Sequence, residues 1–476
     1  MMIGGARLAR QWGKVGTRFL PFADAASDSL PLSRIIRLSL FQVSVGMAMV
    51  LLTGTLNRVM IVELGVPASV VAFMVALPIV FAPVRALIGH RSDTYRSHLG
   101  WRRVPFIWMG TMVQFGGFAI MPFALLVLTG GGAAATPYAG EIGAALAFLL
   151  VGAGLHTTQT AGLALACDLA PPATRPRVVA LLYVMLLVGM LISALLFSAL
   201  LSDFSHLRLI QVVQGAAVIT IVLNMVALWK QEGRNPSRTD PERKRVAFKD
   251  AWSVMSASSR ARRLLVTVAL GTAAFSMQDV LLEPYGGQVL NLGVSATTML
   301  TAILALGTIA GLVLAARALS AGLDPCRLAA FGALAGLPAF AFVILSAPLE
   351  SSAVFRLGTL LIGFGGGLFS VGMLTAAMDL ARASDSGIAI GVWGAVQATA
   401  MGLAVGMGGA LRDIIQALAD RGLLGPAFAH PDAAYGVVYH IEIALLFATL
   451  IAIGPLVRYV SEPENKRTFG LAEFPG

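Results

Sequence analysis

Twelve long apolar runs dominate this chain of 476 residues. Each run is close to the ~20 residues that an α-helix needs to cross the hydrocarbon core of a bilayer. Only 12% of the residues are charged, whereas a water-soluble domain carries about 25%. The sequence therefore predicts an all-α polytopic membrane protein. The expected spans are residues 38–62, 68–89, 104–128, 143–167, 177–201, 208–229, 264–290, 296–318, 327–347, 354–379, 387–410 and 437–459.

One long polar segment divides the twelve runs into two groups of six. The groups resemble each other weakly, because LGVPAS (64–69) follows the first run and LGVSAT (292–297) follows the seventh. Repeated halves of this kind are common in transporter folds. We expect a cytoplasmic amphipathic N-terminal arm (1–37), an N-terminal six-helix half (38–229), a cytoplasmic linker (230–263), a C-terminal six-helix half (264–459) and a cytoplasmic tail (460–476).

Basic residues predict the orientation of the spans. With both termini on one side of the membrane, all but six of the 34 Lys and Arg residues fall in the loops and ends of that side. The positive-inside rule makes that side cytoplasmic. The net charge of +10 is then a topological signal, and no nucleic-acid partner is expected. The six exceptions are Arg58, Arg85, Arg208, Arg356, Arg412 and Arg421. In the N-terminal arm, apolar residues at helical spacing beside Arg and Lys indicate a helix on the membrane surface; a plain basic tail is the alternative.

The loop between the second and third spans, GHRSDTYRSHLGWRRVP (89–105), holds Gly89, Asp93, Gly100, Arg102 and Arg103. This pattern resembles the signature loop of the major facilitator superfamily, in which a Gly and an Asp precede a second Gly and basic residues. Two extra residues separate Asp93 from Gly100 here. The resemblance implies the twelve-helix fold of that superfamily, with two pseudo-symmetric halves, and a latch on the cytoplasmic side. An ordinary basic loop is the alternative.

Two aspartates end spans at corresponding places in the two halves. Asp168 ends the fourth span and Asp379 ends the tenth. Because the C-terminus of a helix disfavours anions, each is expected to have a cationic partner and a gating or structural role. Arg102 and Arg103 are available to Asp168, as are two arginines of the next loop.

Two carboxylates lie one helical turn apart in the apolar stretch FSMQDVLLEPYGGQVL (275–290). Asp279 and Glu283 would share one face of a helix, and Pro284 should bend it because proline cannot donate to the carbonyl of Val280. A charged Asp in hydrocarbon costs about 2.5–3.5 kcal/mol. The acids are therefore expected to face the protein interior, and burial favours a neutral form for one of them.

Three interpretations of these acids stay open. In the first interpretation, a site for a ligand or partner is formed by Gln278, Asp279, Glu283 and Tyr285. In the second they form a structural network with polar residues of the first span, such as Asn57 and Arg58. In the third they couple a transporter to protons.

A closer resemblance rests on three phrases: GTLNRVMIVELGVPASVVA, RSDTYRSHLGWRRVPFIW and MQDVLLEPYGG. They are similar to the PucC and LhaA branch of the superfamily, the bacteriochlorophyll delivery family, along nearly the whole chain. The resemblance implies an assembly factor, or chaperone, for light-harvesting complexes in the inner or intracytoplasmic photosynthetic membrane of a purple bacterium. Its implied partners are bacteriochlorophyll, antenna polypeptides and the reaction centre. The LhaA type, which serves the core antenna, is favoured over the PucC type, which serves the peripheral antenna.

The magnesium of bacteriochlorophyll takes an axial ligand, commonly an imidazole. His156 and His440 lie within expected spans and are the candidate ligands. A hydrogen bond across helices is the alternative role for each. No phosphate loop or nucleophile set is present in the sequence. We therefore expect a non-catalytic assembly factor, with a proton-coupled secondary transporter of a small solute as the alternative.

Overall fold

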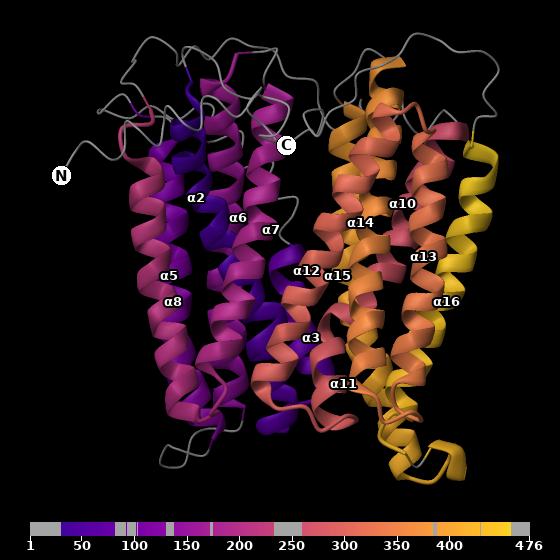
Figure 1. The fold of residues 1–476 in the computed structure, drawn as a ribbon. Helices are drawn as coiled ribbons and strands as arrows, with labels where there is room; N and C mark the ends of the chain where they lie inside the picture. The colour runs from indigo at the N-terminus through magenta and orange to yellow at the C-terminus, as the bar shows by residue number, and fades with distance from the viewer. Residues whose placement is uncertain are drawn as a thin grey trace.

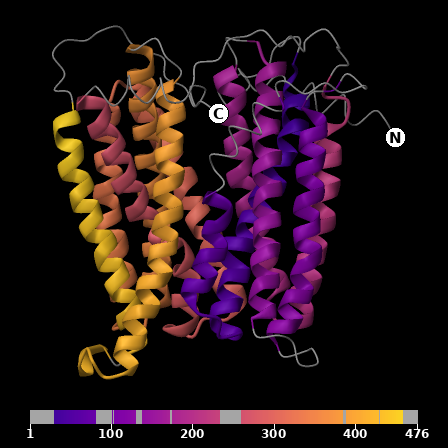
Figure 2. The ribbon, with the colours of Figure 1, turned by 180° about the vertical axis from the view of Figure 1, so that it is seen from behind.

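The computed structural model describes residues 30–80, 92, 101, 103–129, 138–171, 175–232, 259–383, 388–428 and 430–457. These residues form two helical bundles that lie side by side, one from each half of the chain (Figure 1). The same two bundles are seen from behind in Figure 2. The expected all-α architecture is confirmed. Most of the expected N-terminal arm, linker and tail lies outside the described residues.

The first bundle begins with α2 (Leu32–Met49), so the helix starts six residues before the expected first span. The helix continues through two π-helical segments, η2 (Val50–Leu56) and η3 (Val59–Glu63). The remaining helices of this half are α3 (Ala68–Val80), α5 (Val104–Leu128), α6 (Ala139–Leu169), α7 (Arg175–Leu200) and α8 (His206–Leu228).

The second bundle begins with α10 (Ser259–Ser276), the 3-10 segment η5 (Met277–Val280) and α11 (Leu282–Gln288). The remaining helices are α12 (Val294–Ser320), α13 (Pro325–Leu345), α14 (Ser352–Ala383), α15 (Ile388–Asp420) and α16 (Ala433–Ile453), with the short 3-10 turns η6 (Pro426–Phe428) and η7 (Gly454–Leu456). The start of α2 and the end of α16 lie at the same end of the molecule (Figure 1).

Eleven helical stretches of the described residues are long and apolar enough to cross a membrane. The helix at the place of the expected second span, α3, is a shorter apolar helix, and the residues that follow it are not described. Together these make the twelve helices that the apolar runs predict.

Glycine allows the closest helix contacts of the second bundle. A Cβ atom on Gly363 of α14 would lie 2.1 Å from the carbonyl oxygen of Leu304 on α12, and one on Gly307 would lie 2.1 Å from that of Leu360. Neither position has room for a side chain. In a membrane, where lipid is as apolar as leucine, such close backbone packing is a main source of helix association.

The first helix of each half is irregular in its second part, where η2 and η3 follow α2 and where η5 and α11 follow α10. These irregular segments touch one another: η2 lies against η5 and α12, and η3 lies against α11. The predicted acidic residues are therefore positioned at the contact between the two halves.

Candidate functional site at the contact between the halves

The seventh span is not one continuous helix. Regular α-helix ends at Ser276 and resumes at Leu282, so Asp279 lies in the 3-10 segment and Glu283 lies in α11. Glu283 is buried, whereas Asp279 is half-buried. The prediction of one helical face carrying both acids is therefore wrong. The interruption lies in the turn before Pro284 and includes Val280, whose carbonyl the proline cannot bond, so the helix is irregular where the bend is expected.

A residue of the first span hydrogen-bonds the carbonyl group that Pro284 leaves without a donor. Proline has no N–H, so the carbonyl of Val280 lacks the donor that a regular helix would give it. Asn57 from the N-terminal half donates from Nδ2 to this carbonyl at 3.0 Å, and also to the carbonyl of Thr53 at 3.0 Å. Because buried carbonyl groups in proteins are almost always hydrogen-bonded, Asn57 is a structural partner of the break in the other half.

Glu283 lies against a glycine of the first span. Its Oε1 accepts a hydrogen bond from the hydroxyl of Thr301 on α12, at 2.5 Å. A Cβ on Gly54 would come within 2.5 Å of the same oxygen. The carboxyl group therefore occupies the space that Gly54 leaves open at the contact between the halves.

Gln278 connects the 3-10 segment to the last span. Its backbone N–H donates to Oε1 of Glu442 on α16 at 2.7 Å. Its side-chain amide donates to Oδ1 of Asp279 at 2.5 Å and to the carbonyl of Phe275 at 3.2 Å. Glu442 is fully buried and belongs to this cluster. The sequence interpretation did not group Glu442 with Asp279 and Glu283.

Tyr285 belongs to a different group of residues. Its hydroxyl donates to the carbonyl of Val343 at 3.1 Å and lies 3.3 Å from the hydroxyl of Ser346. Its ring packs edge-on against Tyr435 and Tyr439, with both pairs of ring centroids 5.5 Å apart. Tyr285 thus packs inside the C-terminal half, while Glu283 faces the N-terminal half.

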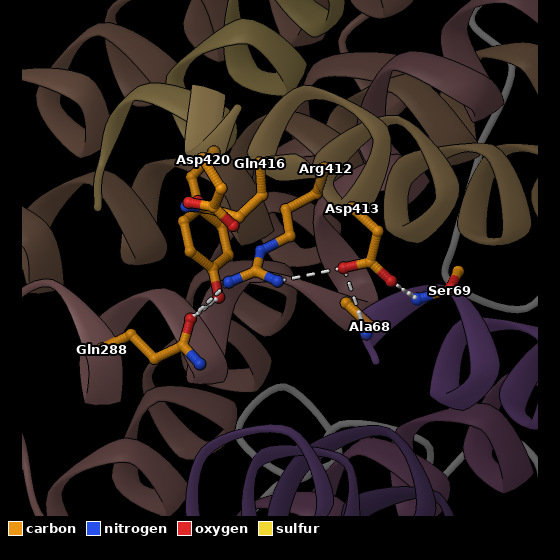
Figure 3. Close-up of polar contacts among 8 residues, drawn as sticks. Ala68, Ser69, Gln288, Arg412, Asp413, Gln416 and Asp420 are labelled. Atoms are coloured by element: carbon orange, nitrogen blue, oxygen red, sulfur yellow. Dashed lines mark hydrogen bonds and ion pairs between the residues drawn. The ribbon is translucent and has the colours of Figure 1, made fainter. Parts of the chain in front are cut away.

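A second polar cluster joins the halves at the N-terminus of α3 (Figure 3). Asp413 of α15 accepts hydrogen bonds from the backbone N–H groups of Ala68, at 3.3 Å, and Ser69, at 2.7 Å. A carboxylate is favourable here because the first N–H groups of a helix lack intrahelical acceptors and carry partial positive charge. Arg412 donates to Asp413 Oδ1 at 3.0 Å and to Gln288 Oε1 at 2.7 Å.

The sequence interpretation did not single out this cluster. It noted Arg412 only as one of the few basic residues opposite the cytoplasmic loops. The signal was the adjacent pair of opposite charges, Arg412 and Asp413, in a long apolar helix. A third contact across the halves is made by Arg58, which pairs with Glu63 and donates to the carbonyl of Leu292 at 3.0 Å.

Of the residues predicted to gate or stabilise the cytoplasmic side, Arg103 and Asp168 are brought together. The Nε of Arg103 donates to Oδ2 of Asp168 at 3.0 Å, and its Nη1 donates to the hydroxyl of Ser92 at 2.6 Å. Asp379 is half-buried near the end of α14. The other four predicted residues lie outside the described residues: Gly89, Asp93, Gly100 and Arg102.

The two candidate pigment ligands lie in different surroundings. His156 is half-buried in α6, and His440 is exposed on α16. The Nδ1 of His440 lies 2.7 Å from the carbonyl oxygen of Gly436, one turn earlier. His440 is exposed whereas Glu442, two residues later on α16, is fully buried, so this histidine lies on a different face of the helix from the acidic cluster.

Solved structures of transporters share this arrangement of helices. A bacterial homologue of the iron transporter ferroportin, in its inward-facing state, has a TM-score of 0.62 at 17% identity, covering 89% of this chain and 98% of that one. The nucleoside transporter NupG has a TM-score of 0.61 at 13% identity, covering 89% and 100%. Identities this low show the fold alone, and it is the expected major-facilitator transporter fold.

Comparison with known sequences is more specific. The chain is 54% identical over 472 residues to an uncharacterized protein from the puhA-bchM intergenic region of Rhodobacter capsulatus, covering 98% of this chain and 99% of that protein. It is 58% identical over 410 residues to Protein PucC of Rhodovulum sulfidophilum, covering 84% and 90%. The family model described as "PUCC protein" matches residues 55–460. By this match and these identities, the chain belongs to the PucC family.

Proposed function

We propose that this protein is a non-catalytic assembly factor for a bacterial light-harvesting complex. It binds bacteriochlorophyll, antenna polypeptides or both while the complex forms. The inner or intracytoplasmic photosynthetic membrane is its proposed location, with both termini cytoplasmic. Membership of the PucC family supports this assignment.

The core antenna around the reaction centre is the proposed client. Support comes from the relative named for the puhA-bchM region, which aligns with nearly the full length of both chains.

The observation that carries the proposal is that interior polar groups form contacts between the two halves. Asn57 bonds the carbonyl left free by Pro284, and Glu283 fills the space beside Gly54. These groups hold one half of the molecule against the other. A scaffold that holds a client needs such contacts between its halves.

The test deletes the gene for this chain from the purple bacterium that carries it. The control is the same strain complemented with the wild-type gene. We expect the deletion to reduce the near-infrared absorbance of the core antenna more than that of the peripheral antenna. The protein purified from native membranes in mild detergent should carry pigment or antenna polypeptides at a fixed ratio. A preparation carrying neither, from a strain whose antenna absorbance is unchanged by deletion, contradicts the proposal.

A second candidate, proton-coupled secondary transport of a small solute, is favoured by one observation. Glu442 is fully buried within a span, and its Oε2 has no hydrogen-bond partner among the described residues. Such an intramembrane acid is typical of proton relays. Proteoliposomes with an imposed proton gradient should then take up a member of a panel of amino acids, sugars and nucleosides. Uptake lost in Asp279→Asn supports transport, and no uptake in the wild type counts against it.

A further inference from the structure

We propose that His440 is the axial ligand for a planar, metal-centred macrocycle, a magnesium chlorin, which binds on the outer surface of α16. This inference rests on the proposed function, in which the chain binds pigment. It goes further by placing the pigment on the outer surface of the bundle, away from the interior acids and from His156.

The position of α16 exposes His440 to lipid. Both views place α16 at the outer edge of the second bundle, and it packs on its inner side against α10, α13 and α15 (Figures 1 and 2). His440 is the eighth residue of this helix, so at 1.5 Å per residue it lies ~10 Å from the helix start. The imidazole is therefore within the hydrocarbon, where an ionisable group is costly and is usually retained for a function.

Hydrogen bonding sets which nitrogen of the ring is available. The carbonyl oxygen of Gly436 is an acceptor, so Nδ1 carries the proton and donates to it over 2.7 Å. In the neutral ring, Nε2 then holds a lone pair, and no described residue donates a hydrogen bond to it. An Nδ1–H bonded to a backbone carbonyl is the arrangement that orients a metal-bound histidine and raises its basicity.

Small residues lie one turn before and one turn after the ring. Gly436 and Ala444 lie four residues before and after His440, on the same face of the helix. Nothing lies within 4 Å of the position that a Cβ on Gly436 would take, and Ala444 is exposed. Phe447, 53% exposed, continues this face one turn further. A planar ligand can therefore approach Nε2 over Gly436 and Ala444, in the turns immediately before and after the ring.

Together these features select the ligand class. Lipid headgroups do not reach this depth, and hydrocarbon tails have no atom that accepts the lone pair of Nε2. A magnesium chlorin has a wide apolar ring that is soluble in lipid and a metal with an open axial position. Coordination by Nε2 forms one metal–nitrogen bond and requires no electron or proton transfer.

The first experiment compares two pigments on the full chain, purified from a host without pigment and reconstituted in lipid nanodiscs. Bacteriochlorophyll a carries magnesium, and bacteriopheophytin a is its metal-free counterpart. We expect the wild type to bind the magnesium pigment at least ~10-fold more tightly, since even the loss of an outer hydrogen bond to a ligand costs 10–100-fold in metal affinity. Fluorescence quenching gives the Kd, and visible absorption reports the axial ligand.

Matched variants then locate the site. His440→Leu should abolish the preference for the magnesium pigment and leave folding intact, because leucine is favourable in lipid. Gly436→Leu should weaken binding of both pigments, because the leucine side chain would fill the open space beside the His440 ring. The controls are Gly215→Leu on α8, another position with open space around it, and His156→Leu, the other candidate ligand. Both should keep wild-type affinity and preference.

Three results overturn the site. In the pigment assay, they are an unchanged preference for the magnesium pigment in His440→Leu and a loss of that preference in His156→Leu. In the native membrane, the third is a His440→Leu protein that loses its co-purified antenna polypeptide but keeps its pigment. The site and the assembly function fail separately. If the wild type binds no pigment while antenna assembly still requires the chain, the His440 site is wrong and the assembly role stands. If His440→Leu loses pigment in nanodiscs and the deletion strain has normal antenna absorbance, the site stands and the assembly role is wrong.

Discussion

At the scale of single residues, the polar groups of the first and seventh spans depend on one another. Pro284 leaves the carbonyl of Val280 without a backbone donor. The side-chain amide of Asn57, from the other half, donates to this carbonyl instead. The sequence predicted that the acids face the interior, and it named Asn57 as a candidate member of a structural network. It could not predict the pairing, because that depends on how two distant irregular segments meet.

Replacing Asn57 by leucine should lower the free energy of unfolding by about 1–3 kcal/mol, because the buried carbonyl of Val280 is left unbonded. The Pro284→Ala background restores an N–H one turn after Val280. In that background the cost of Asn57→Leu should fall well below its cost in the wild type. Thermal unfolding in detergent measures all four proteins of this double-mutant cycle. Equal costs in both backgrounds would show that Asn57 acts on another group.

Glu283→Gln should leave the protein folded and antenna assembly intact. The substitution keeps an oxygen that can accept from Thr301 and nearly the same volume beside Gly54. Core-antenna absorbance in the complemented deletion strain measures the effect. Loss of assembly with normal protein levels would mean that a negative charge at this position is required.

At the scale of elements, the sequence predicted the number and type of helices and a bend beside Pro284, but not the 3-10 geometry there or the π-helical segments of the first span. The apolar runs located the helices because hydrocarbon demands long apolar segments with internally bonded backbones. The 3-10 segment Met277–Val280 lies before Pro284 because partners from other helices stabilise it, including Glu442, which accepts from the N–H of Gln278. Contacts of that kind carry no local sequence signal.

The cluster at the N-terminus of α3 gives a prediction at this scale. Asp413→Leu removes the acceptor for the N–H groups of Ala68 and Ser69, and loss of such a cap costs ~0.5–2 kcal/mol. We expect a lower unfolding temperature in detergent. The control is Asp420→Asn on the same helix, an exposed residue whose carboxylate bonds only the half-buried Gln416 in the described structure (Figure 3). A similar drop in unfolding temperature in both variants would indicate a general charge effect.

At the scale of the whole molecule, the distribution of basic residues predicts that both termini and the long linker are cytoplasmic. Green fluorescent protein fused after Gly476 should fluoresce, since it folds on the cytoplasmic side. Alkaline phosphatase inserted after Ser205 should be active, and the same enzyme inserted within residues 233–258 should be inactive. The reverse pattern would invert the proposed topology.

All the hydrogen bonds described between the halves lie toward one end of the molecule, the end at which α2 and its continuation finish and α12 begins. They include Asn57 to Val280, Arg58 to Leu292, and Ser198 to Ser295. Toward the other end the halves meet through apolar side chains, since Ala180 of α7 is buried in one cluster with Ala315 and Leu319 of α12. The contact between the halves therefore differs along its length, with hydrogen bonds at one end and apolar packing toward the other.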